Sequence, residues 1–157
     1  MTDIEISRGY APGAIGRVVE MHGDYYARRW GFGVFFEAKV AKTLARFLSR
    51  YDEKRDGFWI ASRTGRVEGS IAIDGLRADT DGAHLRWFIV SEDLHGRGVG
   101  SALLSNAVDF CRSSGYRKVY LWTFEGLLSA RRLYEKARFR LVEQRPGTQW
   151  GKEVHEQ

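Results

Sequence analysis

The chain has 157 residues, 43% of them hydrophobic and 13% aromatic, which suits one packed domain and excludes a disordered protein. Its net charge is +5, but the arginines are scattered along the chain instead of gathered in one patch, so a nucleic-acid partner is not favoured. No apolar run reaches about 18 residues, the first residues lack a signal segment, and Cys111 is the only cysteine, so we expect no membrane partner and a cytoplasmic location.

Apolar spacing predicts the elements of the first half of the chain. Residues 3–8 alternate and predict a strand. Two helices are expected next, from Ala14 to about Arg29 and from about Val34 to Arg50. A hairpin then follows, with strands at Phe58–Arg63 and Val67–Ile73.

The second half alternates strands and helices. A buried strand is predicted at Leu85–Val90, and a helix after it ends at Ser113-Ser114, with Gly115 just past its end. The remaining expected elements are a strand at Lys118–Thr123, a helix at Ser129–Ala137, and a final antiparallel pair at Phe139–Glu143 and Gln149–Val154, joined through Arg145–Thr148. This order predicts an α+β (mixed α/β) fold in a single domain over residues 1–157.

A glycine-rich turn, His95-Gly96-Arg97-Gly98-Val99-Gly100, joins the buried strand to its helix. The first amides of a helix lack partners within it and carry partial positive charge, and glycine lets a ligand approach the backbone. Arg97 adds a permanent cation. The pattern therefore favours phosphate binding over a turn used only for packing. Its spacing matches neither a P-loop nor a dinucleotide fingerprint.

The turn resembles the coenzyme A loop of the GNAT (Gcn5-related N-acetyltransferase) family, Arg/Gln-x-x-Gly-x-Gly/Ala, with His95 at the first position. The predicted order of elements is also that of the GNAT fold. The resemblance implies a mostly antiparallel central sheet with a splayed parallel strand pair, flanked by helices. It also implies an N-acetyltransferase that uses acetyl-CoA as cosubstrate and no metal, and in which an amine attacks directly. The acceptor would be a small-molecule or protein amine.

The resemblance also assigns site residues. The pantetheine arm would lie along Phe88, Ile89 and Val90. The pyrophosphate would lie on His95, Gly96, Arg97, Gly98, Val99, Gly100 and Ser101. Tyr134, in Leu133-Tyr134-Glu135-Lys136-Ala137-Arg138-Phe139, matches the family's general acid. The chain departs from the family at His95, at Leu127 where an asparagine is common, and at Arg138 where glycine is usual.

Several alternatives stay open. The general base could be any of five residues: Glu37, His22, His84, Glu68 or Glu92. The alternative function is an acyl-CoA-binding sensor or regulatory module with little catalysis, because residues 4–48 also resemble acetyltransferase modules that follow MarR-type regulators. The sequence does not specify the acceptor. The resemblance suggests a homodimer, because dimers are common among such domains, but the sequence specifies no interface.

Overall fold

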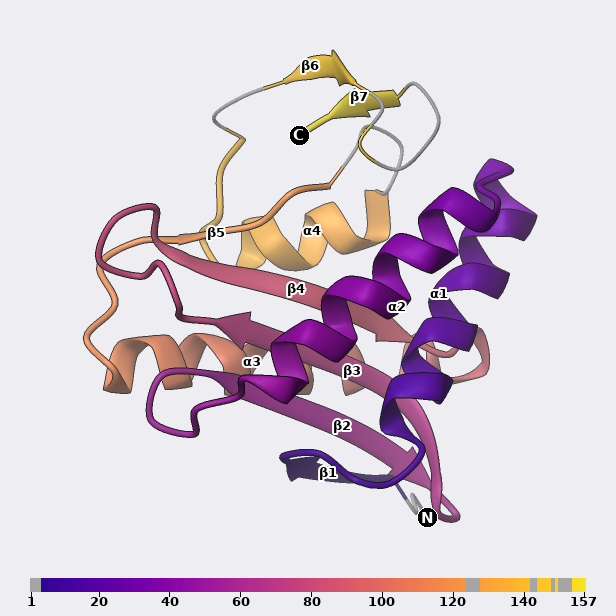
Figure 1. The fold of residues 1–157 in the computed structure, drawn as a ribbon, viewed down its shortest axis with the longest axis horizontal. Coiled ribbons are helices and arrows are strands. Elements are labelled where there is room, and N and C mark those ends of the chain that lie inside the picture. Colours follow the sequence, from indigo (N-terminus) through magenta and orange to yellow (C-terminus); the bar gives the residue numbers. More distant parts are fainter. Residues whose placement is uncertain (1–3, 124–127, 142–143, 148, 150–153) are drawn as a thin grey trace.

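The computed structural model describes residues 4–123, 128–141, 144–147, 149 and 154–157. Its centre is a five-stranded sheet in the order β1-β2-β3-β4-β5 (Figure 1). Neighbouring strands are antiparallel except β4 and β5, which are parallel. The strands are β1 (Ile4–Arg8), β2 (Gly57–Arg63), β3 (Arg66–Asp74), β4 (Ala83–Val90) and β5 (Val119–Tyr120). The predicted mixed α/β fold class is confirmed.

Helices cover both faces of the sheet. On one face, α1 (Ala14–Trp30) and α2 (Val34–Ser49) pack over a core that includes Phe47 and Phe58 (Figure 1). On the other, α3 (Val99–Ser113) and α4 (Leu128–Lys136) pack over a second core. None of the described helices combines the length and apolar character needed to cross a bilayer.

The strand β4 has two irregularities that shape its surroundings. Ser70 pairs with Ile89 and Ala72 with Arg86, so Trp87 and Phe88 together oppose Ile71 in a β-bulge. Trp87 takes a φ of +48°, and the Ser70 hydroxyl donates a 2.7 Å hydrogen bond to the Trp87 carbonyl. The second irregularity is that β5 pairs with β4 only at Ala83 and His84. Beyond His84, no described strand pairs with that edge of β4, as expected for a splayed pair.

The C-terminal strands differ from the sequence prediction. β5 spans only Val119–Tyr120, and the final pair is β6 (Arg145–Gly147) with β7 (Val154–Glu156). Residues 139–141 are not a strand, because the Phe139 ring packs against Tyr134 at 5.9 Å and belongs to the core under α4. Packing against the helix therefore outweighs the alternating pattern. Residues 142–143, 148 and 150–153 lie outside the described residues.

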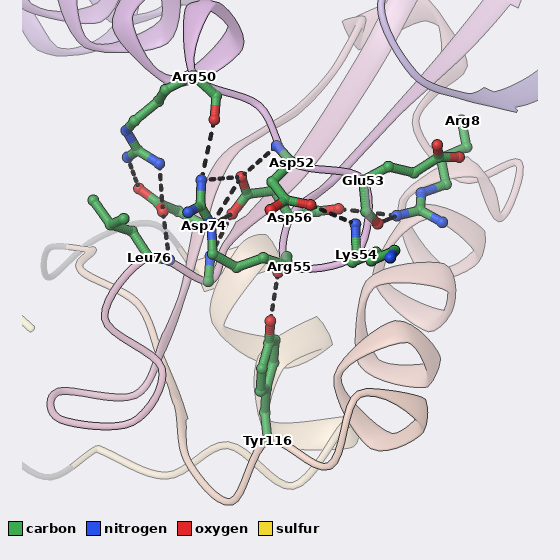
Figure 2. A network of polar contacts seen from close by, with 11 residues as sticks. Arg8, Arg50, Asp52, Glu53, Lys54, Arg55, Asp56, Asp74, Leu76 and Tyr116 are labelled. Carbon is green, nitrogen blue, oxygen red and sulfur yellow. Dashed lines mark hydrogen bonds and ion pairs between the residues drawn. The ribbon is translucent and has the colours of Figure 1, made fainter.

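A network of polar contacts joins the α2–β2 loop to the end of β3 (Figure 2). The fully buried Asp56 carboxylate accepts hydrogen bonds from the Asp52 and Gly75 amides, at 3.0 and 2.8 Å, and from the Arg55 guanidinium. The Tyr116 hydroxyl donates to the Arg55 carbonyl. The Asp56 carboxylate is thus fully engaged, so the network is structural and holds the C-terminal end of α2 beside the end of β3.

Candidate functional site

The glycine-rich turn forms an open backbone cradle between β4 and α3. A short 3-10 helix, η1 (Glu92–Leu94), leads into it. Gly96 and Gly98 have φ values of +81° and +78°, and a Cβ added to either would meet nothing within 4 Å. Among the described residues no side chain caps the start of α3. The first amides of this helix therefore remain available to an anion, as the sequence predicted.

The turn borders a cleft of about 690 Å³, here named the loop cleft. Its walls also include Tyr25, Tyr26 and Trp30 from α1. The cleft brings together nine of the ten predicted cofactor residues: Phe88, Ile89, Val90, His95, Gly96, Gly98, Val99, Gly100 and Ser101. Arg97 is exposed and does not line the cleft. Gly100 permits close packing here, because a Cβ added to it would lie 3.2 Å from Leu133 Cδ1.

His95 stabilises the glycine-rich turn by a contact with the end of β4. One of its ring nitrogens lies 2.9 Å from the Val90 carbonyl oxygen, which ties the turn back onto the end of β4. Where the family has arginine or glutamine, this chain therefore has a ring that closes the turn on itself. The imidazole still lines the loop cleft.

A second, smaller pocket lies beside the β4 bulge and is named the bulge pocket. It has a volume of about 170 Å³. Its walls come from α1, α2, β4, the segment after β5, α4 and Gln149; they are His22, Tyr26, Phe36, Lys39, Val40, Thr43, His84, Leu85, Arg86, Trp87, Phe88, Leu121, Trp122, Thr123, Ala130, Tyr134 and Gln149. Tyr26, Phe88 and Ala130 line both pockets. The two hollows therefore meet at these three residues.

Tyr134 lies near this junction. It lines the bulge pocket, and its ring is 5.9 Å from that of Phe88. Its hydroxyl has no hydrogen-bond partner among the described residues. Burial, with a smaller contribution from Tyr26, raises the pKa of Tyr134 above its usual value, so the phenol keeps its proton at neutral pH and can donate it.

The five candidate bases separate into two groups. His22 and His84 line the bulge pocket. Burial lowers the pKa of His22 to about 4, and burial together with the Arg86 charge lowers that of His84 to about 3, so both rings are neutral near pH 7.

The three carboxylates lie outside both pockets. Glu68 pairs with Arg17 and Arg63, and Glu92 pairs with Arg28 and Arg29. Glu37 is exposed and packs across Gly23.

Sequence reasoning missed the polar lining of the bulge pocket, chiefly Arg86 and Lys39. These residues are far apart in the chain and form no motif. One signal was present: His84 and Arg86 alternate with apolar residues in a strand at the centre of the sequence. Polar residues at such positions occupy one face of the sheet together. The departure at Leu127 lies outside the described residues.

Comparisons with known proteins agree with this geometry. Residues 18–139 match the model of the acetyltransferase (GNAT) family. An uncharacterised N-acetyltransferase of Methanocaldococcus jannaschii is 29% identical over 104 residues, which is 62% of this chain and 45% of that protein. The N-acetylaspartate synthetase of Danio rerio is 33% identical over 85 residues, which is 54% of this chain and 30% of that protein. The chain spans less than half the length of these curated relatives.

Solved structures share the fold. A GNAT-family acetyltransferase from Staphylococcus aureus Mu50 superposes with a TM-score of 0.73 at 17% identity, covering 98% of this chain and 97% of that one. A predicted acetyltransferase from Clostridium acetobutylicum, solved with acetyl-CoA, has a TM-score of 0.67 at 13% identity, covering 89% and 92%. With the family match over most of its length, the chain belongs to the GNAT family of acetyltransferases.

Proposed function

We propose that this protein is an acetyl-CoA-dependent N-acetyltransferase that binds acetyl-CoA in the loop cleft and an amine in the bulge pocket. The observation that carries the proposal is the junction of the two pockets at Tyr26, Phe88 and Ala130. A transferase needs two substrates to meet, and here a phenol that can donate a proton, that of Tyr134, lies beside the shared residue Phe88.

The residues of the loop cleft fit acetyl-CoA. The open backbone at Gly96 and Gly98 and the uncapped start of α3 suit a pyrophosphate. Arg97, exposed next to them, adds positive charge. Phe88, Ile89 and Val90, along the splayed part of β4, would hold the pantetheine arm. Acetyl-CoA also accords with the ligand of the Clostridium acetobutylicum neighbour.

When bound, acetyl-CoA supplies an activated thioester. In the overall reaction a C–N bond forms, the C–S bond breaks, the amine gives up a proton, and the leaving sulfur gains one. Tyr134 is the proposed donor of that last proton. His22 and His84 are the proposed acceptors of the amine's proton, directly or through water, because both are neutral and line the amine's pocket.

Release of the coenzyme A thiol tests this proposal. Purified protein with acetyl-CoA should release free thiol when a suitable amine is added and much less without one. The screen should cover amino acids, polyamines and peptide N-termini, with aspartate included because the Danio rerio relative is named N-acetylaspartate synthetase. Failure of every amine, together with no heat of binding at millimolar acetyl-CoA, would overturn the proposal.

The acyl-CoA sensor considered from the sequence is not favoured. A sensor has no need of a second pocket joined to the first. A cytoplasmic location and a single domain over residues 1–157 are part of the proposal. The location is supported only by the sequence, which contains a single cysteine, Cys111. Its thiol is buried, and burial raises its pKa to about 12. Such a thiol is unreactive and suits a structural role. A homodimer stays a prediction from the resemblance.

A further inference from the structure

The bulge pocket has an unbalanced charge. Its lining contains one arginine and one lysine but no aspartate or glutamate among the described residues. The nearby carboxylate of Asp74 is already engaged by Arg50, with nitrogen–oxygen distances of 2.6 and 3.2 Å. Burial disfavours its ionisation, but the Arg50 hydrogen bonds outweigh that and hold the pKa of Asp74 below its usual value. This acid is therefore occupied and lies outside the lining.

Arg86 is the principal cation of this pocket. The bulge packs its guanidinium over the Trp87 ring, 4.2 Å from the ring centroid. Unlike Arg17, Arg50 and Arg55, each paired with a carboxylate, Arg86 has no carboxylate within 4 Å among the described residues. Burial lowers its pKa, but an arginine remains charged at neutral pH. The Asp74 charge acts on Arg86 only from a longer distance. A half-buried charge with no carboxylate in direct contact is costly, and a bound anion would lower that cost.

Lys39 adds a second positive charge from α2. Its ammonium donates a 2.6 Å hydrogen bond to the Gln149 carbonyl, which places this cation in the wall of the pocket. The two histidines of the pocket contribute no charge near pH 7. Among the described lining residues, the charged side chains are therefore two cations, Arg86 on β4 and Lys39 on α2.

We propose that the amine acceptor carries a carboxylate that Arg86 binds in the bulge pocket, so that the substrate class is a small amino acid. This inference rests on the proposed acetyl transfer. A planar guanidinium forms paired hydrogen bonds with a carboxylate. The volume of about 170 Å³ corresponds to about five or six water molecules, which suits a free amino acid.

The same field would assist the chemistry. A positive environment disfavours a second positive charge, so it lowers the pKa of an ammonium group placed in it. An amino acid held by its carboxylate would lose its amine proton more easily there than in water. This accounts for a site whose described lining offers weakly basic histidines and no carboxylate to the amine.

The test compares each free amino acid with its carboxamide, which has nearly the same shape but lacks the carboxylate charge. The readout is kcat/KM for thiol release by the wild-type protein. The amide is the less basic amine and has more neutral nucleophile at pH 7, so a preference for the acid cannot come from amine reactivity. We expect the best acid to exceed its amide by at least about tenfold, the effect of one charged hydrogen-bonded contact.

Variants then assign the effect to Arg86. Arg86→Gln should raise KM for the acid at least about tenfold and bring the acid-to-amide ratio near one. Arg86→Lys should keep part of the preference, and the KM for acetyl-CoA should not change. Arg112→Gln, which removes an exposed arginine from α3, is the control and should behave as the wild type.

The outcomes separate the two proposals. Amides acetylated as well as acids by the wild-type protein would overturn the inference while leaving acetyl transfer intact. Absence of both acetyl-CoA binding and thiol release would overturn the proposed function itself. If Arg86→Gln does not fold, judged by its thermal melt, the acid-to-amide ratio of the wild-type protein decides the question.

Discussion

The loop cleft and the bulge pocket lie on either side of Phe88 but are built in different ways. The loop cleft is made mainly by one continuous stretch, residues 88–101, and offers backbone amides and apolar walls. The bulge pocket is made by side chains from several separate elements and offers charge. A ligand shared by a whole family can be held by backbone, whereas a ligand particular to one member is selected by side chains.

The largest expected effect is at the junction between the two pockets. Tyr134→Phe removes a proton donor while keeping the ring that packs against Phe88 and Phe139. We expect kcat to fall roughly 100-fold or more, the usual contribution of a general acid, with the affinity for acetyl-CoA unchanged. Steady-state kinetics and calorimetry check this, with Tyr10→Phe at an exposed tyrosine as control. An unchanged kcat would remove Tyr134 from the mechanism.

The next effect is confined to the loop cleft. Gly98→Glu forces a side chain into a φ of +78° and places a carboxylate where an anion should bind. We expect acetyl-CoA affinity to fall roughly 100-fold, about 2.7 kcal/mol. Gly115→Glu is a matched control, because Gly115 has a φ of +74° and equally open surroundings at the other end of α3. Equal losses of affinity in both variants would contradict a specific anion site.

Lowering the pH should destabilise the folded protein through a buried histidine of the bulge pocket. The pKa of His22 falls from 6.5 to about 4 in the folded protein, so the unfolded chain takes up the proton first as the pH drops. The free energy of unfolding should therefore be highest above pH 6.5 and decrease toward pH 4. His22 alone predicts a loss of about 2 kcal/mol between pH 7 and pH 5.

Urea unfolding at pH 7 and pH 5 measures this loss. In His22→Gln the decrease should be smaller by about the same 2 kcal/mol, with the contribution of His84 remaining. A variant that loses as much stability as the wild type would show that His22 does not govern the acid sensitivity.

The smallest expected effect is on stability, at the C-terminal end of α4, the helix that carries Tyr134. Arg138 follows the C-terminal end of α4 and has a φ of +73°. The Arg138 amide donates to the Glu135 carbonyl, and the Phe139 amide donates to the Tyr134 carbonyl. Glycine is the usual residue at this position of such a helix end. The amides of Gly115 and Tyr116 end α3 in the same way. Arg138→Gly should therefore raise the free energy of unfolding by about 0.5–1 kcal/mol, and Gly115→Ala should lower it by a similar amount. Thermal melting measures both, and a lower melting temperature for Arg138→Gly would contradict the prediction.

Most of the fold and the glycine turn of the loop cleft could be predicted from the sequence because both follow from local patterns, whereas the bulge pocket could not. Strands and helices up to α4 follow local periodicity, and the glycine turn is local too. The bulge pocket depends on a β-bulge at Trp87 and on the distant residue Lys39, neither of which leaves a local pattern. The final strand pair was placed wrongly because Phe139 packs under α4, a contact that alternation alone does not reveal.

Binding of acetyl-CoA at the loop cleft can be tested by titrating isotope-labelled protein with acetyl-CoA and following the backbone amide signals. We expect the largest shifts at residues 88–90 and 96–101, with little change at residues 112–116 at the far end of α3. Large shifts elsewhere, with the turn from Gly96 to Gly100 unaffected, would contradict the assignment of the loop cleft to acetyl-CoA.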